Sequence, residues 1–150
     1  MSKGHCYLAQ LAALDTILDR NYFCPKYLRP GEEFFGHPKR DDNSSIFRVS
    51  SGSLGQGIAM ANGVSLANKI RGETKRTWTL IGDGEFNEGS CSEALHFMSQ
   101  HALNLIVVLD NNRQESLDFT DQILSNGSIK QRVRSLNISY FEKDGHNKQE

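Results

Sequence analysis

The chain has 150 residues, about the length of a single domain, and 37% of them are hydrophobic. That content excludes a disordered tail, and no apolar run approaches the ~20 residues needed to span a bilayer. The 17 Lys and Arg residues nearly balance the 18 Asp and Glu residues, and a net charge of −1 removes the electrostatic argument for nucleic-acid binding. We therefore expect a globular protein that binds neither nucleic acid nor a membrane.

The start of the chain and its cysteines indicate a compartment. The residues that follow Met1 contain no apolar stretch of the signal-peptide kind. Cys6, Cys24 and Cys91 are scattered and form no CxxC pair. These features predict a cytoplasmic protein with free thiols.

The first half of the chain predicts two helices separated by a loop. Leucines recur at near-helical spacing between residues 4 and 20. The loop carries all three prolines and the acidic, polar run at residues 41–45. A glycine-rich segment at residues 52–57 then leads into a second expected helix over residues 58–67, which has small residues on several faces.

The middle of the chain predicts a βαβ unit. Residues 77–81 form a short β-rich run, and apolar residues recur at helical spacing over residues 91–98. Residues 105–109 are continuously apolar, which is typical of a strand buried on both faces. A strand, a helix and a strand within ~30 residues predict a parallel sheet.

The segments after residue 128 add a helix and a strand to the prediction, and the predicted fold class is α/β. A further helix is expected over residues 129–136 and a further strand over residues 138–142. The basic residues from Lys130 to Arg134 are expected on the solvent side of that helix. Cys91 is expected in the core, because it lies on the apolar face of its own helix.

Polar clusters follow both strands of the expected βαβ unit. Gly82-Asp83-Gly84 follows the first strand and Asn111-Asn112 follows the second. Consecutive parallel strands bring their carboxyl ends together, where α/β sheets bind ligands. The Asp83 carboxylate and the Asn112 carbonyl are hard oxygen donors suited to Mg²⁺ or Ca²⁺. Taken alone each motif is consistent with a plain turn, but together they predict a divalent cation that bridges the protein to a phosphate or diphosphate.

The surroundings of these clusters resemble the transketolase family. The two clusters themselves resemble the thiamine diphosphate signature. The segments that carry the resemblance are SKGH at 2–5, GHP at 36–38, SGSLGQG at 51–57, GDGEFNEG at 82–89 and DGH at 144–146. They occur in the family's order across nearly the whole chain. The similarity is closest to split transketolases, whose N-terminal half is a separate polypeptide.

The resemblance implies which residues hold the metal and the diphosphate. Asp83 and Asn112 would hold Mg²⁺ (or Ca²⁺), and the backbone carbonyl of Gln114 would be a third protein ligand. Gly82 and Gly84 would lie at the diphosphate.

The resemblance also implies roles at the reacting end of the cofactor. Gly52 and Leu54 would lie against the aminopyrimidine ring. His5 and His37 are the catalytic candidates, which would face the reacting carbon and hydrogen-bond the hydroxyls of the sugar phosphate substrates. Glu88 would join the acidic contacts that link paired cofactor sites across a dimer.

The activity implied by the resemblance is ketol transfer, in which a two-carbon unit passes from a ketose phosphate to an aldose phosphate. The family has further segments before SKGH and after DGH, as well as pyrimidine-binding and C-terminal domains. We therefore expect residues 1–150 to be a partial diphosphate-binding domain that forms homo-oligomers and is inactive without a partner chain supplying the pyrimidine-binding domain.

Two alternatives remain open. One is a truncated or degenerate, non-catalytic fragment that acts at most as an interaction module. The other is a different thiamine diphosphate enzyme, such as a 2-oxoacid dehydrogenase component, against which the GHP and SLGQG segments argue. The donor and acceptor sugars are not predicted.

Overall fold

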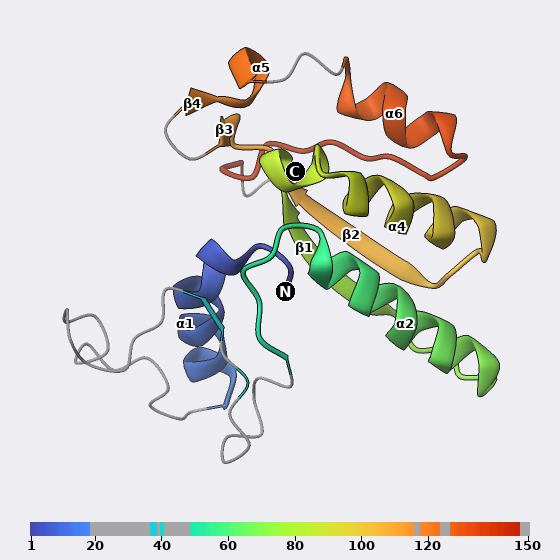
Figure 1. Cartoon of the computed structure of the whole chain (residues 1–150). Coiled ribbons are helices and arrows are strands. Elements are labelled where there is room, and N and C mark those ends of the chain that lie inside the picture. Colours follow the sequence, from blue (N-terminus) through green and yellow to red (C-terminus); the bar gives the residue numbers. More distant parts are fainter. Residues whose placement is uncertain (19–36, 39, 41–48, 116–117, 124–126, 148–150) are drawn as a thin grey trace.

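A computed structural model describes residues 1–18, 37–38, 40, 49–115, 118–123 and 127–147 of the chain. The predicted α/β class is confirmed (Figure 1). In chain order the elements are η1 (Gly4–Cys6), α1 (Tyr7–Leu18), α2 (Gln56–Ile70), β1 (Thr77–Gly82), α3 (Asp83–Phe86), α4 (Gly89–Gln100), β2 (Leu105–Asp110), β3 (Gln114–Glu115), β4 (Asp118–Phe119), α5 (Thr120–Ile123) and α6 (Ile129–Ser135).

The centre of the fold is the predicted βαβ unit. Strands β1 and β2 are parallel, with Thr77 opposite Leu105 and Gly82 opposite Asp110. Helix α4 connects them, and α2 packs beside α4 through a hydrogen bond that the Asn62 side chain donates to the carbonyl of Ala94 (2.7 Å). The expected parallel pairing is therefore present.

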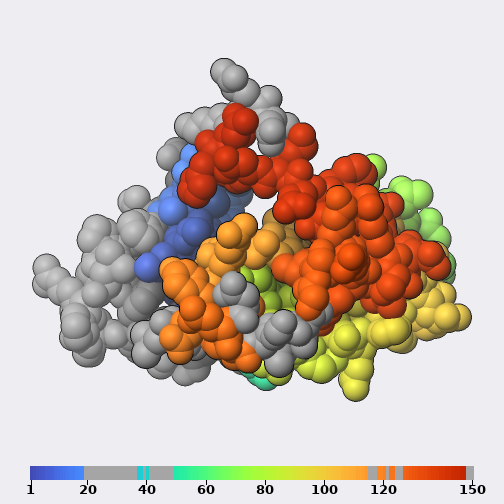
Figure 2. Space-filling model, turned by 90° about the horizontal axis from the view of Figure 1, so that it is seen from above, coloured from blue at the N-terminus to red at the C-terminus, as the bar shows by residue number. Residues whose placement is uncertain are grey.

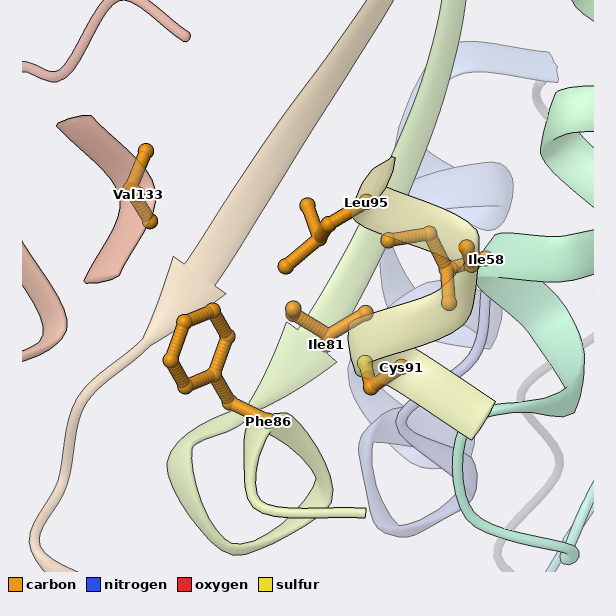
Figure 3. Packing of buried hydrophobic residues seen from close by; sticks show 7 residues of the cluster. Ile58, Ile81, Phe86, Cys91, Leu95 and Val133 are labelled. Carbon is orange, nitrogen blue, oxygen red and sulfur yellow. The ribbon is translucent and has the colours of Figure 1, made fainter. Parts of the chain in front are cut away.

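The core lies between β1 and the helices that cover it (Figure 3). Ile58 of α2, Ile81 of β1 and Cys91 of α4 are completely buried, and Cys91 is in the core as predicted. Phe86 and Leu95 complete the packing around Ile81. Burying such side chains stabilises the fold by about 1.5–3 kcal/mol each for the large apolar ones.

The opposite face of the two strands is open in the described structure, which corrects the expectation that the second strand is buried on both faces. Trp78 of β1 is 61% exposed and Val108 of β2 is 45% exposed. The apolar run at 105–109 correctly predicts a strand. It does not predict which other segments cover the two faces of that strand. The described helices α2 and α4 pack on one side only.

The strand expected over residues 138–142 is wrong. This segment has no regular secondary structure, although Ile138 and Tyr140 still pack against the core. A β-rich pattern becomes a strand only where a neighbouring backbone offers a hydrogen-bond ladder, and this segment forms none with the described strands.

The expectation for the basic residues of α6 is correct for Lys130 and Arg134, which are exposed, and wrong for Arg132. Arg132 donates hydrogen bonds to the Asn87 side chain (2.9 Å) and to the Phe86 carbonyl (3.3 Å), and its guanidinium lies 4.4 Å from the centre of the Phe86 ring. This side chain docks α6 onto α3.

Within the described ranges, no helix has both the length and the apolar character that crossing a bilayer requires. In the same ranges Cys6 and Cys91 are free thiols, whereas Cys24 lies outside the described residues.

Candidate functional site

The carboxyl ends of β1 and β2 form one edge of the fold. Their register ends with Gly82 opposite Asp110, so Asp83 and Asn111 are the first residues beyond two aligned strand ends. In the space-filling view from above, the N-terminal residues (blue) and the segment around β3, β4 and α5 (orange) lie on the same side of the molecule (Figure 2). The two polar motifs therefore leave the sheet at the same edge.

Asp83 is buried at this edge. It begins the short helix α3, and only 3% of the residue is exposed. One of its carboxylate oxygens accepts a hydrogen bond from the Thr120 hydroxyl (2.7 Å). None of the ion pairs found among the described residues includes Asp83. Because a buried carboxylate is costly without a compensating cation or donors, its surroundings fit a bound divalent cation.

Asn112 lies beyond the end of β2 and is exposed. Its side-chain oxygen accepts a hydrogen bond from the backbone N–H of Gln114 (3.0 Å). Arg113, between them, has a φ of 58°, a left-handed conformation that non-glycine residues rarely adopt. This tight turn directs the chain from β2 into the β3–β4 hairpin. The hairpin is also tied back by the Thr120 N–H, which donates to the Arg113 carbonyl (3.1 Å).

The candidate metal ligands at this edge are oxygen atoms, and only one of them belongs to a carboxylate. No group of three or more His, Cys, Asp or Glu residues that could hold a metal occurs in the described ranges. The candidate ligands are one carboxylate (Asp83), one amide oxygen (Asn112) and one main-chain carbonyl (Gln114). Mg²⁺ is commonly held by few protein oxygens together with water and phosphate oxygens, so the chemistry of this set suits it.

The N-terminal segment lies across the ends of both strands. The backbone N–H groups of Ser2 and Lys3 both donate to the Leu80 carbonyl (3.0 and 2.9 Å). The Lys3 ammonium continues to the Asp110 carboxylate (2.5 Å), and a side chain at Gly82 would contact the Lys3 stem at 3.5 Å. Lys3 thus joins the end of β1 to the end of β2.

The two candidate catalytic histidines are neighbours. The ring centroids of His5 and His37 are 5.0 Å apart, with an angle of 58° between the planes. His5 is exposed and His37 is partly buried. Gly4 must lack a side chain here, because a Cβ would overlap the His37 ring. Gly36, the first residue of the GHP segment, lies outside the described residues.

The glycine-rich loop approaches the same histidine. The ring of His37 would be 3.7 Å from a Cβ placed on Gly52, and Leu54 is 40% exposed. Gly55 has a φ of 80°, and a Cβ there would overlap the Ser90 hydroxyl. The loop therefore packs tightly against the start of α4 while the Leu54 side chain stays accessible.

The remaining candidates are Gly84 and Glu88. Gly84 is buried within α3, so GDG is the start of a short helix rather than an open turn. Glu88 is exposed at the N-cap position of α4. Described contacts bring together His5, His37 and Gly52. Asp83 directly follows β1, and Asn112 lies two residues beyond the end of the neighbouring strand β2.

Sequence reasoning missed several residues at this edge. Thr120 gives no motif signal, because its hydroxyl reaches Asp83 only through the hairpin that folds back. Ser2, Lys3 and Glu85 lie inside the quoted motifs, yet their partners are far away in the sequence. Their position inside those motifs is the only sequence signal that could have identified these three residues as part of the site.

Comparisons with known proteins identify the family of the chain. The family model described as 1-deoxy-D-xylulose-5-phosphate synthase matches residues 18–146. One of the subunits of apulose-4-phosphate transketolase from Phocaeicola vulgatus is 30% identical over 97% of this chain and 52% of its own length. A 6-deoxy-6-sulfo-D-fructose transketolase subunit from Clostridium sp. is 32% identical over 100% of this chain and 55% of its own length.

Transketolase from Bacillus subtilis is also similar, with 33% identity over 81% of this chain and 19% of its own length. The chain spans about half the length of the two apulose-4-phosphate transketolase subunits that it matches. These matches agree with the motifs at both strand ends. The chain belongs to the transketolase family, as a thiamine diphosphate-binding N-terminal domain.

Proposed function

We propose that the chain is the diphosphate-binding component of a transketolase-type enzyme, which moves a two-carbon ketol unit from a ketose phosphate to an aldose phosphate. The observation that carries this proposal is the buried Asp83 carboxylate, which has no ion-pair partner among the described residues and lies at the aligned ends of β1 and β2. We infer that this edge receives a metal and a diphosphate, as the resemblance of the two polar clusters to the thiamine diphosphate signature implies.

Asp83, Asn112 and the Gln114 carbonyl would hold Mg²⁺, and the backbone around Gly82 and Gly84 would lie at the diphosphate. Asp83 supplies the only full negative charge in this set, so it would contribute most of the affinity for the cation. Thiamine diphosphate, when bound, supplies the carbon nucleophile for the transfer, and the protein supplies orientation and electrostatics.

His5 and His37 would act on the substrate side. A neutral imidazole carries one donor and one acceptor nitrogen, so two adjacent rings can orient sugar hydroxyls and exchange protons with them. Gly52 and the accessible Leu54 side chain would offer an apolar contact to the aminopyrimidine ring. Glu88, exposed at the N-cap of α4, would contact a second copy in a homo-oligomer.

The proposal includes a partner. Two relatives are named as subunits of an apulose-4-phosphate transketolase, and this chain spans about half of each. We infer that residues 1–150 act as a partial N-terminal domain in a cytoplasmic assembly that also contains a pyrimidine-binding domain. Alone, the chain would bind the cofactor weakly and would not turn over sugar. The rival is a non-catalytic fragment that acts only through interactions.

A second candidate activity is the formation of 1-deoxy-D-xylulose 5-phosphate, because the matching family model carries that description over residues 18–146. The named relatives favour ketol transfer. The product that the complete assembly forms separates the two.

The first test is calorimetric titration of thiamine diphosphate with and without Mg²⁺. We expect binding that requires Mg²⁺ and falls about 100-fold in Asp83→Ala, because that variant loses the charged ligand. Glu93→Ala, which removes an exposed carboxylate on α4, is the matched control and should bind like the wild type. Thiamine diphosphate affinity that is the same without Mg²⁺ and in Asp83→Ala would refute the metal site.

The second test is co-expression with a chain that carries a transketolase pyrimidine-binding domain. Ketol transfer that appears only with this partner supports the split enzyme. Absence of both cofactor binding and transfer would leave the non-catalytic fragment as the better description.

A further inference from the structure

A second buried carboxylate lies beside the proposed cofactor site and has no role in the function proposed above. Glu85 of α3 is 3% exposed. One of its oxygens accepts hydrogen bonds from the Ser2 hydroxyl and from the backbone N–H of Gly55 (2.8 Å). The other oxygen accepts from the backbone N–H of Gly82 (3.2 Å).

The three donors belong to three separate segments of the chain. Ser2 begins the segment that carries His5, Gly55 lies in the glycine-rich loop, and Gly82 precedes Asp83. The Ser2 hydroxyl also accepts a hydrogen bond from the Gly57 N–H (3.0 Å), so it links Glu85 to the start of α2. One side chain therefore joins three of the segments from which the proposed cofactor contacts come.

The chemistry of this network suits a side chain whose two oxygens both accept hydrogen bonds. A carboxylate only accepts hydrogen bonds, and here it receives a hydroxyl and two backbone N–H groups, as an acceptor with several lone pairs can. A glutamine cannot replace it fully, because its amide N–H₂ would face a donor in either orientation. At least one buried donor would then lose its partner.

We propose that Glu85 is a positioning residue that holds the His5 segment, the glycine-rich loop and the Asp83 segment in the arrangement that receives thiamine diphosphate. The effect on the cofactor rests on the function proposed above. The arrangement of the segments themselves does not, because every contact that forms it is made within the chain.

The test compares Glu85→Gln with Asn62→Ala. Asn62 makes a buried hydrogen bond from α2 to α4, beyond the first turn of α2, so its loss destabilises the fold away from the three segments. For each variant we would measure the free energy of unfolding, the dissociation constant for thiamine diphosphate with Mg²⁺, and amide hydrogen exchange at Gly55 and Gly82 without cofactor.

We expect both variants to unfold more easily, but only Glu85→Gln to bind the cofactor about 10-fold more weakly and to lose amide protection at Gly55 or Gly82, whichever N–H then faces the amide N–H₂. Unchanged affinity and protection in Glu85→Gln, or equal weakening in Asn62→Ala, would overturn the proposal. If the wild type does not bind the cofactor, the proposed function fails, and the exchange data still decide whether Glu85 holds the segments.

Ser2→Ala keeps the test decisive if Glu85→Gln does not fold. It leaves the carboxylate in place and removes one of its donors together with the acceptor for Gly57. We expect faster exchange at Gly57 and a smaller loss of cofactor affinity, and unchanged exchange at Gly57 would overturn the proposed linkage.

Discussion

Asp83 is the side chain on which the proposed metal site depends most. Its carboxylate is buried, and the Thr120 hydroxyl donates a hydrogen bond to one of its oxygens. Among the described residues no hydrogen bond to the other oxygen is present, so it is open to a further partner. The hydrogen bond from Thr120 also fixes the rotamer of the carboxylate, so less side-chain entropy would be lost when a cation binds.

We expect Thr120→Val to weaken Mg²⁺-dependent binding of thiamine diphosphate about 10-fold, because the carboxylate loses a hydrogen bond that orients it. Thr120→Ser keeps the hydroxyl and should restore most of the affinity. Calorimetry on the two variants measures the difference. Equal affinity in Thr120→Val and the wild type would show that the hydroxyl does not orient Asp83.

Cys91 gives a residue-scale expectation about pH. Burial raises the pKa of its thiol from 9.0 to about 12. The unfolded chain therefore releases this proton above pH 9, whereas the folded protein keeps it up to about pH 12, and the free energy of unfolding must fall over that window.

The contribution of Cys91 to this fall is at most about 1.4 kcal/mol per pH unit. Chemical denaturation between about pH 8 and about pH 10.5 should show a shallower decline in Cys91→Ala than in the wild type. The same slope in Cys91→Ala and in the wild type would contradict the raised pKa.

At the scale of elements, the sequence predicts well which segments form the longer helices and strands. It predicts poorly which neighbouring segments they pair with. The helices at 7–18 and 89–100 follow from apolar periodicity, and the helix at 56–70 from the small residues after the glycine-rich segment. The two parallel strands follow from a short β-rich run and a continuous apolar run. The segment at 138–142 has the right composition for a strand but no hydrogen-bonded neighbour in the described structure. The hairpin of β3 and β4 has no periodicity to reveal it, because each strand has two residues.

In the candidate site too, local motifs are predicted from the sequence, whereas contacts between distant segments are not. The motifs identify Asp83 and Asn112 as polar residues at neighbouring strand ends, and the register of β1 and β2 agrees with that placement. Thr120 lies in no motif, and its contact with Asp83 spans 37 positions. Glu85 lies inside the GDGEFNEG segment, but its contact with Ser2 spans 83 positions, so the motif alone does not reveal its partner.

The attachment of α6 can be tested through Arg132. We expect Arg132→Ala to lower the free energy of unfolding by about 1–3 kcal/mol, because it removes two hydrogen bonds and the contact with the Phe86 ring. Arg134→Ala, at an exposed position of the same helix, should change it by less than about 0.5 kcal/mol. Urea denaturation of both variants measures the difference, and equal effects would contradict this docking.

At the scale of the whole chain, the sequence spans about half the length of two related transketolase subunits. One face of its central strands is open in the part that the structure describes. Trp78, the single tryptophan, lies on that face and is 61% exposed. We expect its fluorescence to be that of a solvent-exposed indole and to be quenched readily by acrylamide. A blue-shifted, protected emission that persists on dilution would contradict the open face.

The central claim is that Asp83 and Asn112 share one cation that carries the diphosphate. A crystal structure of the protein with Mg²⁺ and thiamine diphosphate tests it most directly. We expect one ion at about 2.1 Å from a carboxylate oxygen of Asp83 and from the side-chain oxygen of Asn112, with diphosphate oxygens completing the coordination. An ion bound elsewhere, or two side chains too far apart to reach the same ion, would contradict the claim.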